Sequence, residues 1–206
     1  MLVGDVQGKG MAAVEVVGLL LSSYRRAVRS GVPLESLPGY LDEGLREDLV
    51  DLEENGAPGT VDSRPVETEF LERFVTAVVV DIVDDGGTVR IANCGHPPPL
   101  LIRGDRVIPL LPDVPELPLG LGDLCRGGHH VDSYDLALGD ILLLYTDGVI
   151  EARNAEGAFY PLADRLAYWT RDTPAVLLED VRNDLTMYSP TGLGDDIAMV
   201  ALQRVA

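Results

Sequence analysis

The chain has 206 residues, and its 46% hydrophobic content is enough to fill the core of one domain. A formal net charge of -18 repels nucleic-acid phosphates and anionic lipid, which argues against nucleic acid as a partner. The two cysteines, Cys94 and Cys125, lack the spacing of a disulfide framework or a zinc site, and no apolar run is long enough to cross a bilayer. We therefore expect one cytoplasmic domain with reduced thiols and no membrane insertion.

The first third of the chain predicts a strand followed by two helices. Residues 1–6 are mostly apolar and lead into a glycine-rich turn, which is typical of a strand. Residues 10–28 and 34–53 carry apolar side chains at helical spacing, so two helices are expected there. Residues 54–65, which contain two glycines and two prolines, predict an exposed loop.

The rest of the chain predicts mainly strands. Residues 74–83 and 88–92 are rich in β-branched side chains and flank an Asp-Asp-Gly-Gly turn, which indicates a hairpin. Further elements are expected in chain order, as strands at 97–102, 106–111, 129–136 and 140–145, helices at 163–170 and 175–185, and a last strand at 197–202. Antiparallel strands interrupted by helices favour an α+β fold, with two stacked, mainly antiparallel sheets flanked by helices.

Three of the predicted strands have an aspartate at one end. Asp5 lies in Gly-Asp-Val-Gln-Gly-Lys-Gly at 4–10, Asp147 follows Tyr-Thr after a strand, and Asp195 follows a glycine before the last strand. A single Asp-Gly pair is more often a structural turn, but three acids at strand ends favour convergence around a cation. Ligands that are all oxygen suit Mg²⁺ or Mn²⁺ rather than zinc, and such ions activate water and hold phosphoryl groups.

The glycine-rich opening does not predict a nucleotide site. Gly8, Lys9 and Gly10 lack the four-residue gap and the Lys-Ser or Lys-Thr ending of a P-loop, and there is no dinucleotide fingerprint. Lys9 is expected to be solvated at the start of a helix.

Five motifs together resemble a known family. They are the segment at 4–10, Phe-Val-Thr at 74–76, Asn-Cys-Gly-His-Pro-Pro-Pro at 93–99, Tyr-Thr-Asp-Gly-Val-Ile-Glu-Ala at 145–152 and Asp-Asp at 195–196. Their order is that of the bacterial stage II sporulation protein E-type phosphatases, in the metal-dependent, protein phosphatase 2C-like superfamily. The resemblance covers essentially the whole chain. It implies an α-β-β-α sandwich with two Mn²⁺ or Mg²⁺ ions, which hydrolyses phosphoserine or phosphothreonine on proteins by metal-activated water.

The resemblance also implies roles for individual residues. Asp5 is expected to bridge the two metals, and the Val6 carbonyl oxygen to be a further ligand of one of them. Asp147 and Asp195 resemble ligands of the other metal, so these three aspartates are the expected catalytic residues. Around them, four residues are expected to support the ligands without binding metal directly: Asp196, Gly148, Glu151 and Thr76. Glu151 is expected to hold Thr146 or a metal-bound water.

The remaining polar residues of the motifs have less specific interpretations. His96 could be a general acid for the leaving oxygen, but its place before three prolines fits a rigid turn that supports the sheet better. Asn93 is expected to bond the backbone of this turn. His129 and His130 are adjacent in a predicted strand, so their side chains should point to opposite faces and cannot chelate one ion together.

The motif set departs from the family pattern at its beginning. Family members carry a further acidic motif upstream of the Gly-Asp-Val turn, and this sequence begins after that position. We expect residues 1–206 to form a single domain that lacks its first strand and one metal ligand, so that one metal site is incomplete. The prediction is a fragment that is weakly active or inactive and a full-length protein that is active.

The family resemblance also predicts the biological setting. The typical substrate is a phosphorylated anti-sigma-factor antagonist, whose dephosphorylation releases a sigma factor in sporulation and stress responses. A homodimer is compatible with the family. Two alternatives remain open, a catalytically silent regulatory domain that uses the same fold to bind proteins, and a phosphohydrolase for small phosphoesters.

Overall fold

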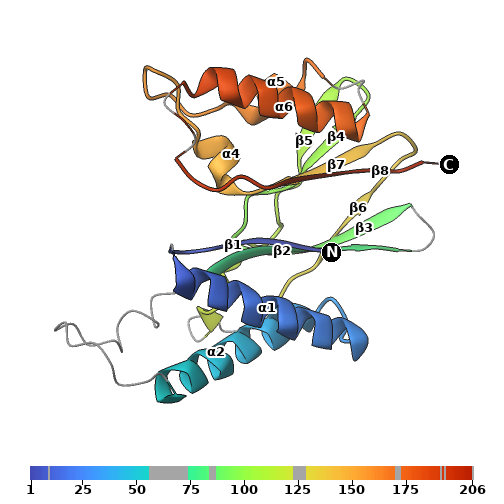
Figure 1. Ribbon diagram of the computed structural model, residues 1–206. Helices are drawn as coiled ribbons and strands as arrows, with labels where there is room; N and C mark the ends of the chain where they lie inside the picture. Colours follow the sequence, from blue (N-terminus) through green and yellow to red (C-terminus); the bar gives the residue numbers. More distant parts are fainter. Residues whose placement is uncertain are drawn as a thin grey trace.

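Two four-stranded antiparallel sheets stack face to face, and helices cover the outer face of each sheet (Figure 1). The computed structural model describes residues 1–8, 10–55, 74–83, 87–122, 129–169, 173–190, 192 and 194–205. Its elements are β1 (Leu2–Val6), α1 (Met11–Arg29), α2 (Leu37–Asn55), β2 (Val75–Ile82), β3 (Thr88–Cys94), β4 (Leu100–Arg103), β5 (Arg106–Pro109), β6 (Asp132–Asp135), β7 (Ile141–Tyr145), α4 (Asp147–Glu151), α5 (Leu162–Leu166), α6 (Pro174–Tyr188) and β8 (Met199–Gln203). The α+β sandwich predicted from the sequence is confirmed.

The two sheets differ in which part of the chain they use. The first sheet has the order β1-β2-β3-β6 and is covered by α1 and α2, whereas the second has the order β5-β4-β7-β8 and is covered by α5 and α6 (Figure 1). The segment between β3 and β4 therefore carries the chain from one sheet to the other. The first and last strands end up in different sheets, which matters for the site described below.

Strand periodicity divides the apolar side chains between three layers. In β2, Val78 and Val80 face the second sheet, while Ala77 and Val79 face α1 and α2. Strand β7 does the same, because Leu142 and Leu144 join the layer between the sheets and its other side chains pack under α5 and α6. Each fully buried Val or Leu contributes about 1.5–3 kcal/mol through the hydrophobic effect, so these layers hold the sheets together. The hydrophobic effect has no preferred direction, so it holds the layers together without fixing individual distances between them.

Most predicted elements occur where they were expected, with differences at their ends. Helix α2 continues to Asn55, so the predicted loop at 54–65 begins inside a helix, and its residues from 56 onward lie outside the described part of the chain. The predicted turn at 84–87 likewise falls mostly outside it. The five-residue helix α4 was not predicted, and β6 starts at Asp132 rather than at 129. Within the described residues, no helix has both the length and the hydrophobicity needed to span a membrane.

Candidate metal centre

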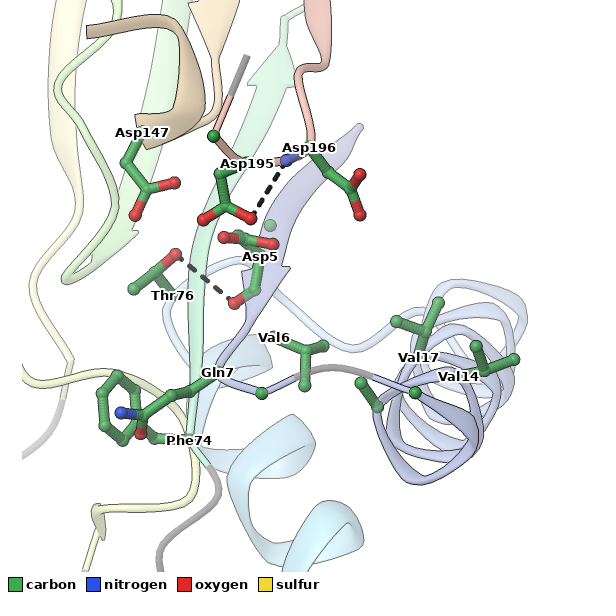
Figure 2. A pocket seen from close by; sticks show the side chains of 15 residues that line it. Asp5, Val6, Gln7, Val14, Val17, Phe74, Thr76, Asp147, Asp195 and Asp196 are labelled. Carbon is green, nitrogen blue, oxygen red and sulfur yellow. Dashed lines mark hydrogen bonds between the residues drawn. The ribbon is translucent and has the colours of Figure 1, made fainter. Parts of the chain in front are cut away.

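Three aspartates from distant parts of the chain meet at one end of the two sheets. Asp5 lies in β1 of the first sheet, Asp147 is the first residue of α4 directly after β7, and Asp195 precedes β8. Each offers a carboxylate oxygen, and these oxygens all lie within 4.8 Å of one another. Figure 2 shows the three side chains turned toward a common point. The convergence expected from the sequence is therefore present.

Backbone pairing places each of the three side chains. Strand β1 pairs with β2 so that Asp5 lies opposite Thr76, and the amide of Gln7 continues the ladder by donating to the Phe74 carbonyl at 3.0 Å. In the second sheet, the Thr146 amide donates to the Ala198 carbonyl at 3.0 Å. The Thr146 hydroxyl in turn accepts from the Ala198 amide at 2.9 Å. This pairing fixes the end of β7 against the start of β8, which brings Asp147 and Asp195 together.

The electrostatics of the cluster favour a bound cation. Burial, followed by the neighbouring Asp147 carboxyl and the charge of Asp195, raises the pKa of Asp5 from 3.8 to about 6. One carboxylate oxygen of Asp147, Oδ1, is buried and has no hydrogen-bond partner. Such an atom carries a desolvation cost unless something binds it. An all-oxygen cluster with an unpartnered buried carboxylate oxygen fits a hard divalent cation such as Mn²⁺ or Mg²⁺.

The aspartates line an open cleft of about 720 Å³. Val6, the expected backbone ligand, also lines this cleft, as do Phe74 and Thr76 from the start of β2. The wall formed by α1 is apolar, with Val14 and Val17 turned toward the cleft and 64% and 41% exposed (Figure 2). The cleft therefore combines an acidic base with an apolar wall.

The expected supporting residues have different surroundings. Asp196 lines the cleft, but its carboxylate points away from the other three, and its amide donates to Asp195 Oδ1 at 3.0 Å (Figure 2). Gly148 is buried where α4 meets the segment before β8.

Glu151 is exposed at the end of α4 and does not line the cleft. The Thr146 hydroxyl donates to the Asp196 carbonyl and accepts from the Ala198 amide. Its partners are therefore backbone groups and not Glu151, which had been expected. Lys9 lies outside the described residues.

His96 is a buried residue that does not line the cleft. Its side chain is 5% exposed, and burial lowers its pKa to about 4, so the ring is neutral. Nδ1 of the ring lies 3.0 Å from the Thr76 hydroxyl. Asn93 bonds the backbone of this turn, as predicted, accepting from the His96 amide at 2.8 Å and donating to its carbonyl at 3.0 Å. The contact between His96 and Thr76 was not predicted, because only the tertiary fold brings these two residues together.

Two other clusters of potential ligands pair internally. Glu116 contacts the ring of His129 through one carboxylate oxygen and the His130 amide through the other, and Cys94 lies beside this pair. His130 pairs with Asp132 at 3.1 Å in the second cluster. The two histidines thus belong to different clusters, in agreement with the prediction that they do not share an ion. Because both oxygens of Glu116 are engaged, this cluster does not offer the open ligand position found at Asp147.

Comparison with known proteins identifies the family of this chain and relatives of its fold. The sequence profile of the family described as stage II sporulation protein E (SpoIIE) matches residues 1–205. The curated protein IcfG of Synechocystis sp. is 26% identical over 222 residues, which cover 98% of this chain and 33% of IcfG. The solved RsbU and RsbW domains of Rv1364c from Mycobacterium tuberculosis are 27% identical with a TM-score of 0.74, covering 100% of this chain and 51% of that one. The chain therefore spans about a third of IcfG and about half of the Rv1364c chain.

A more distant structure shares the fold and contains metal. The catalytic domain of the serine/threonine protein phosphatase PstP, solved in complex with 2 manganese ions, is 12% identical with a TM-score of 0.61. The alignment covers 97% of this chain and 84% of that one, and at this identity it speaks for the fold alone. From the profile match over nearly its whole length, the chain belongs to the stage II sporulation protein E family.

Proposed function

We propose that this chain is the catalytic part of a protein serine/threonine phosphatase that depends on Mn²⁺ or Mg²⁺. The observation that carries the proposal is the meeting of Asp5, Asp147 and Asp195 at the base of an open cleft, with a buried Asp147 oxygen that lacks a partner. A structural turn explains an isolated aspartate, but not three from separate segments, where burial and then mutual repulsion raise the pKa of Asp5.

Asp5, Asp147 and Asp195 would hold one cation, and the Val6 carbonyl oxygen would be a ligand of a second. When bound, a divalent ion lowers the pKa of water and neutralises charge on phosphoryl oxygens, and these are the two needs of phosphate ester hydrolysis. The protein's own contribution is to hold the three carboxylates in place around the ion. Following the family resemblance, two such ions are proposed.

A protein substrate fits this cleft better than a small phosphoester. The cleft is open, and exposed Val14 and Val17 offer apolar contact area beside the carboxylates. A free phosphorylated amino acid has no group to cover this wall, whereas the residues that flank a phosphoserine in a protein do. Following the family resemblance, we propose a phosphorylated anti-sigma-factor antagonist as the substrate class, which would place the enzyme in sporulation or stress signalling.

The test is metal-dependent phosphate release from a phosphoserine protein of this class. Asp147→Asn and Asp195→Asn are expected to abolish turnover, because each removes a charged ligand. Asp164→Asn, which alters an exposed aspartate in the first turn of α5, is the matched control and should leave turnover unchanged. Full activity in both ligand variants would remove the basis of the proposal, and faster turnover of free phosphoserine than of the phosphoprotein would support a small-molecule phosphohydrolase.

The same assay tests the alternative of a silent regulatory module. If the chain binds its protein substrate without hydrolysing it, the domain is instead such a module.

A further inference from the structure

The proposed metal centre is divided between two sheets that share no backbone ladder. Asp5 belongs to β1 of the first sheet, while Asp147 and Asp195 are attached to β7 and β8 of the second. Within each sheet, hydrogen bonds fix the strand positions, whereas the buried layer between the sheets is an apolar cluster, and Arg103 of β4 also donates to the Asp135 carbonyl of β6 at 2.7 Å. Apolar packing does not specify distances as directed hydrogen bonds do. A metal centre needs such a directed contact, because its ligands must be held in a defined geometry.

His96 occupies the point where the chain passes from the first sheet to the second. It lies in the segment between β3 and β4, and the Asn93 side chain clamps both its amide and its carbonyl. Gly95 has a φ of 68° and forms a bridge with Ala77, and a β-carbon there would lie 2.8 Å from a ring carbon of Pro118. The backbone that carries His96 is therefore firmly held against the first sheet.

The ring of His96 connects this backbone to Asp5. Nδ1 lies 3.0 Å from the Thr76 hydroxyl, and that hydroxyl is 3.5 Å from the carbonyl oxygen of Asp5, its partner on β1. Thus the His96 side chain contacts the residue that pairs with Asp5, and the hydroxyl of that residue links it to the Asp5 backbone.

Both His96 and Asp147 have a buried polar side-chain atom without a hydrogen-bond partner. Among the described side chains, three buried polar atoms have no hydrogen-bond partner, and two of them are Nε2 of His96 and Oδ1 of Asp147. A buried polar group without a partner is costly and is rare in a region that serves packing alone. The third, Ser23 Oγ, lies between α1 and α2.

We propose that His96 is a positioning residue of the metal centre, which acts through the Thr76 hydroxyl to hold the backbone of Asp5 where the shared ion needs its carboxylate. It is not a catalytic acid, because its ring is buried and does not line the cleft that a substrate would enter. The inference rests on the metal-dependent function proposed above, and it adds a function for the Asn-Cys-Gly-His segment and for Thr76.

The experiment measures Mn²⁺ binding directly, by calorimetry and by the electron paramagnetic resonance of the ion, without relying on turnover. Thr76→Val removes the hydroxyl at nearly constant shape and should raise the Mn²⁺ dissociation constant roughly tenfold, as is typical when a supporting partner of a metal ligand is lost. Thr76→Ser keeps the hydroxyl and should restore most of the affinity. Ser23→Ala, which removes a buried hydroxyl away from the cleft, is the matched control and should bind Mn²⁺ as the unmodified chain does.

His96 is tested in the same way and then combined with Thr76. His96→Leu should weaken binding about as much as Thr76→Val, while His96→Asn, which keeps a polar atom near the position of Nδ1, should recover part of the loss. In the double variant with Thr76→Val and His96→Leu, the loss should be no larger than in one single variant, because both remove the same link. If His96→Leu does not fold, the Thr76→Val and Thr76→Ser pair decides the question alone.

The outcomes separate this inference from the proposed function. Unchanged Mn²⁺ affinity in Thr76→Val, or losses that multiply in the double variant, would overturn the role of His96. The metal centre itself would still stand if Asp147→Asn abolishes Mn²⁺ binding. If the unmodified chain binds no Mn²⁺ that depends on Asp147, the metal centre and its positioning residue both fall.

Discussion

A β-carbon placed on Gly148 would lie 2.4 Å from the carbonyl oxygen of Asp196, so α4 and the segment before β8 touch through a position that only glycine can occupy. This contact lies one residue from Asp147 on one side and one residue from Asp195 on the other. The distance between two of the proposed ligands therefore depends on the absence of a side chain at position 148.

The first prediction follows from this contact. Gly148→Ala should push the Asp196 backbone away and weaken Mn²⁺ binding, and the overpacking should cost about 1–3 kcal/mol of stability. Chemical denaturation and Mn²⁺ titration measure the two effects. In Gly18→Ala, where no atom lies within 4 Å of the new β-carbon and the residue is in a helix, stability should instead rise by up to about 1 kcal/mol with unchanged Mn²⁺ affinity. Equal behaviour of the two variants would contradict the packing argument.

The second prediction concerns pH. In the metal-free protein, the pKa of Asp5 is raised from 3.8 to about 6, so the folded state binds this proton more tightly than the unfolded chain does. Its contribution to stability is therefore greatest below pH 4 and is lost as the pH rises to about 6. A cation replaces the proton, so Mn²⁺ should raise the melting temperature more at pH 7.5 than at pH 5. Thermal unfolding with Mn²⁺ or with a chelator at both pH values tests this, and Asp5→Asn should remove the difference. An equal rise of the melting temperature with Mn²⁺ at pH 5 and pH 7.5 would contradict the competition between the cation and the proton at Asp5.

A third prediction separates substrate contact from chemistry. Val14→Ser and Val17→Ser remove apolar surface from the α1 wall of the cleft, so each should raise the KM for a phosphoprotein about fivefold, which corresponds to about 1 kcal/mol of lost contact. Turnover of p-nitrophenyl phosphate, which is too small to cover the wall, should stay the same. Val28→Ser, at the other end of α1 and also exposed, serves as the control. A loss that is equal for both substrates would argue against a docking role.

The fourth prediction tests a contact that supports the fold and not the site. The buried Asp140 carboxylate accepts from Nε and Nη2 of Arg103 at 2.9 and 2.7 Å and from the Ala137 amide at 2.7 Å. Asp140→Ala should lower the free energy of unfolding by about 2–3 kcal/mol, because it leaves these donors without their partner. Mn²⁺ affinity should not change, since Asp140 lies at the opposite end of β7 from Asp147. A stability change below about 0.5 kcal/mol, the range of ordinary surface substitutions, would refute the assignment.

Much of the fold could be predicted from the sequence because its strands are long or strongly apolar. Residues 74–83 and 140–145 are apolar on both faces, which fits strands buried between a second sheet and a layer of helices. Helix α4 was missed because five residues are too few for a helical period, and its start at Asp147 follows a strand without a break. The start of β6 was placed too early because His129 and His130 resemble strand residues but bind Glu116 and Asp132 in a loop.

The candidate site could be predicted in part. Asp5, Asp147 and Asp195 were detectable because each is a carboxylate at the end of an apolar strand, and such ends gather at the edges of sheets. The contact between Thr76 and His96 was not detectable, since nothing in either motif indicates that a hydroxyl on one strand meets a ring on a connection 20 residues later. Close approaches such as Gly148 against Asp196 also arise only when two distant segments are packed together.

The most direct test of the central claim is anomalous scattering from crystals of this chain soaked in Mn²⁺. The account predicts a manganese peak among the carboxylates of Asp5, Asp147 and Asp195, and its loss in Asp147→Asn. A well-diffracting, Mn²⁺-soaked crystal with no peak at these three side chains would contradict the metal centre and the phosphatase function proposed from it.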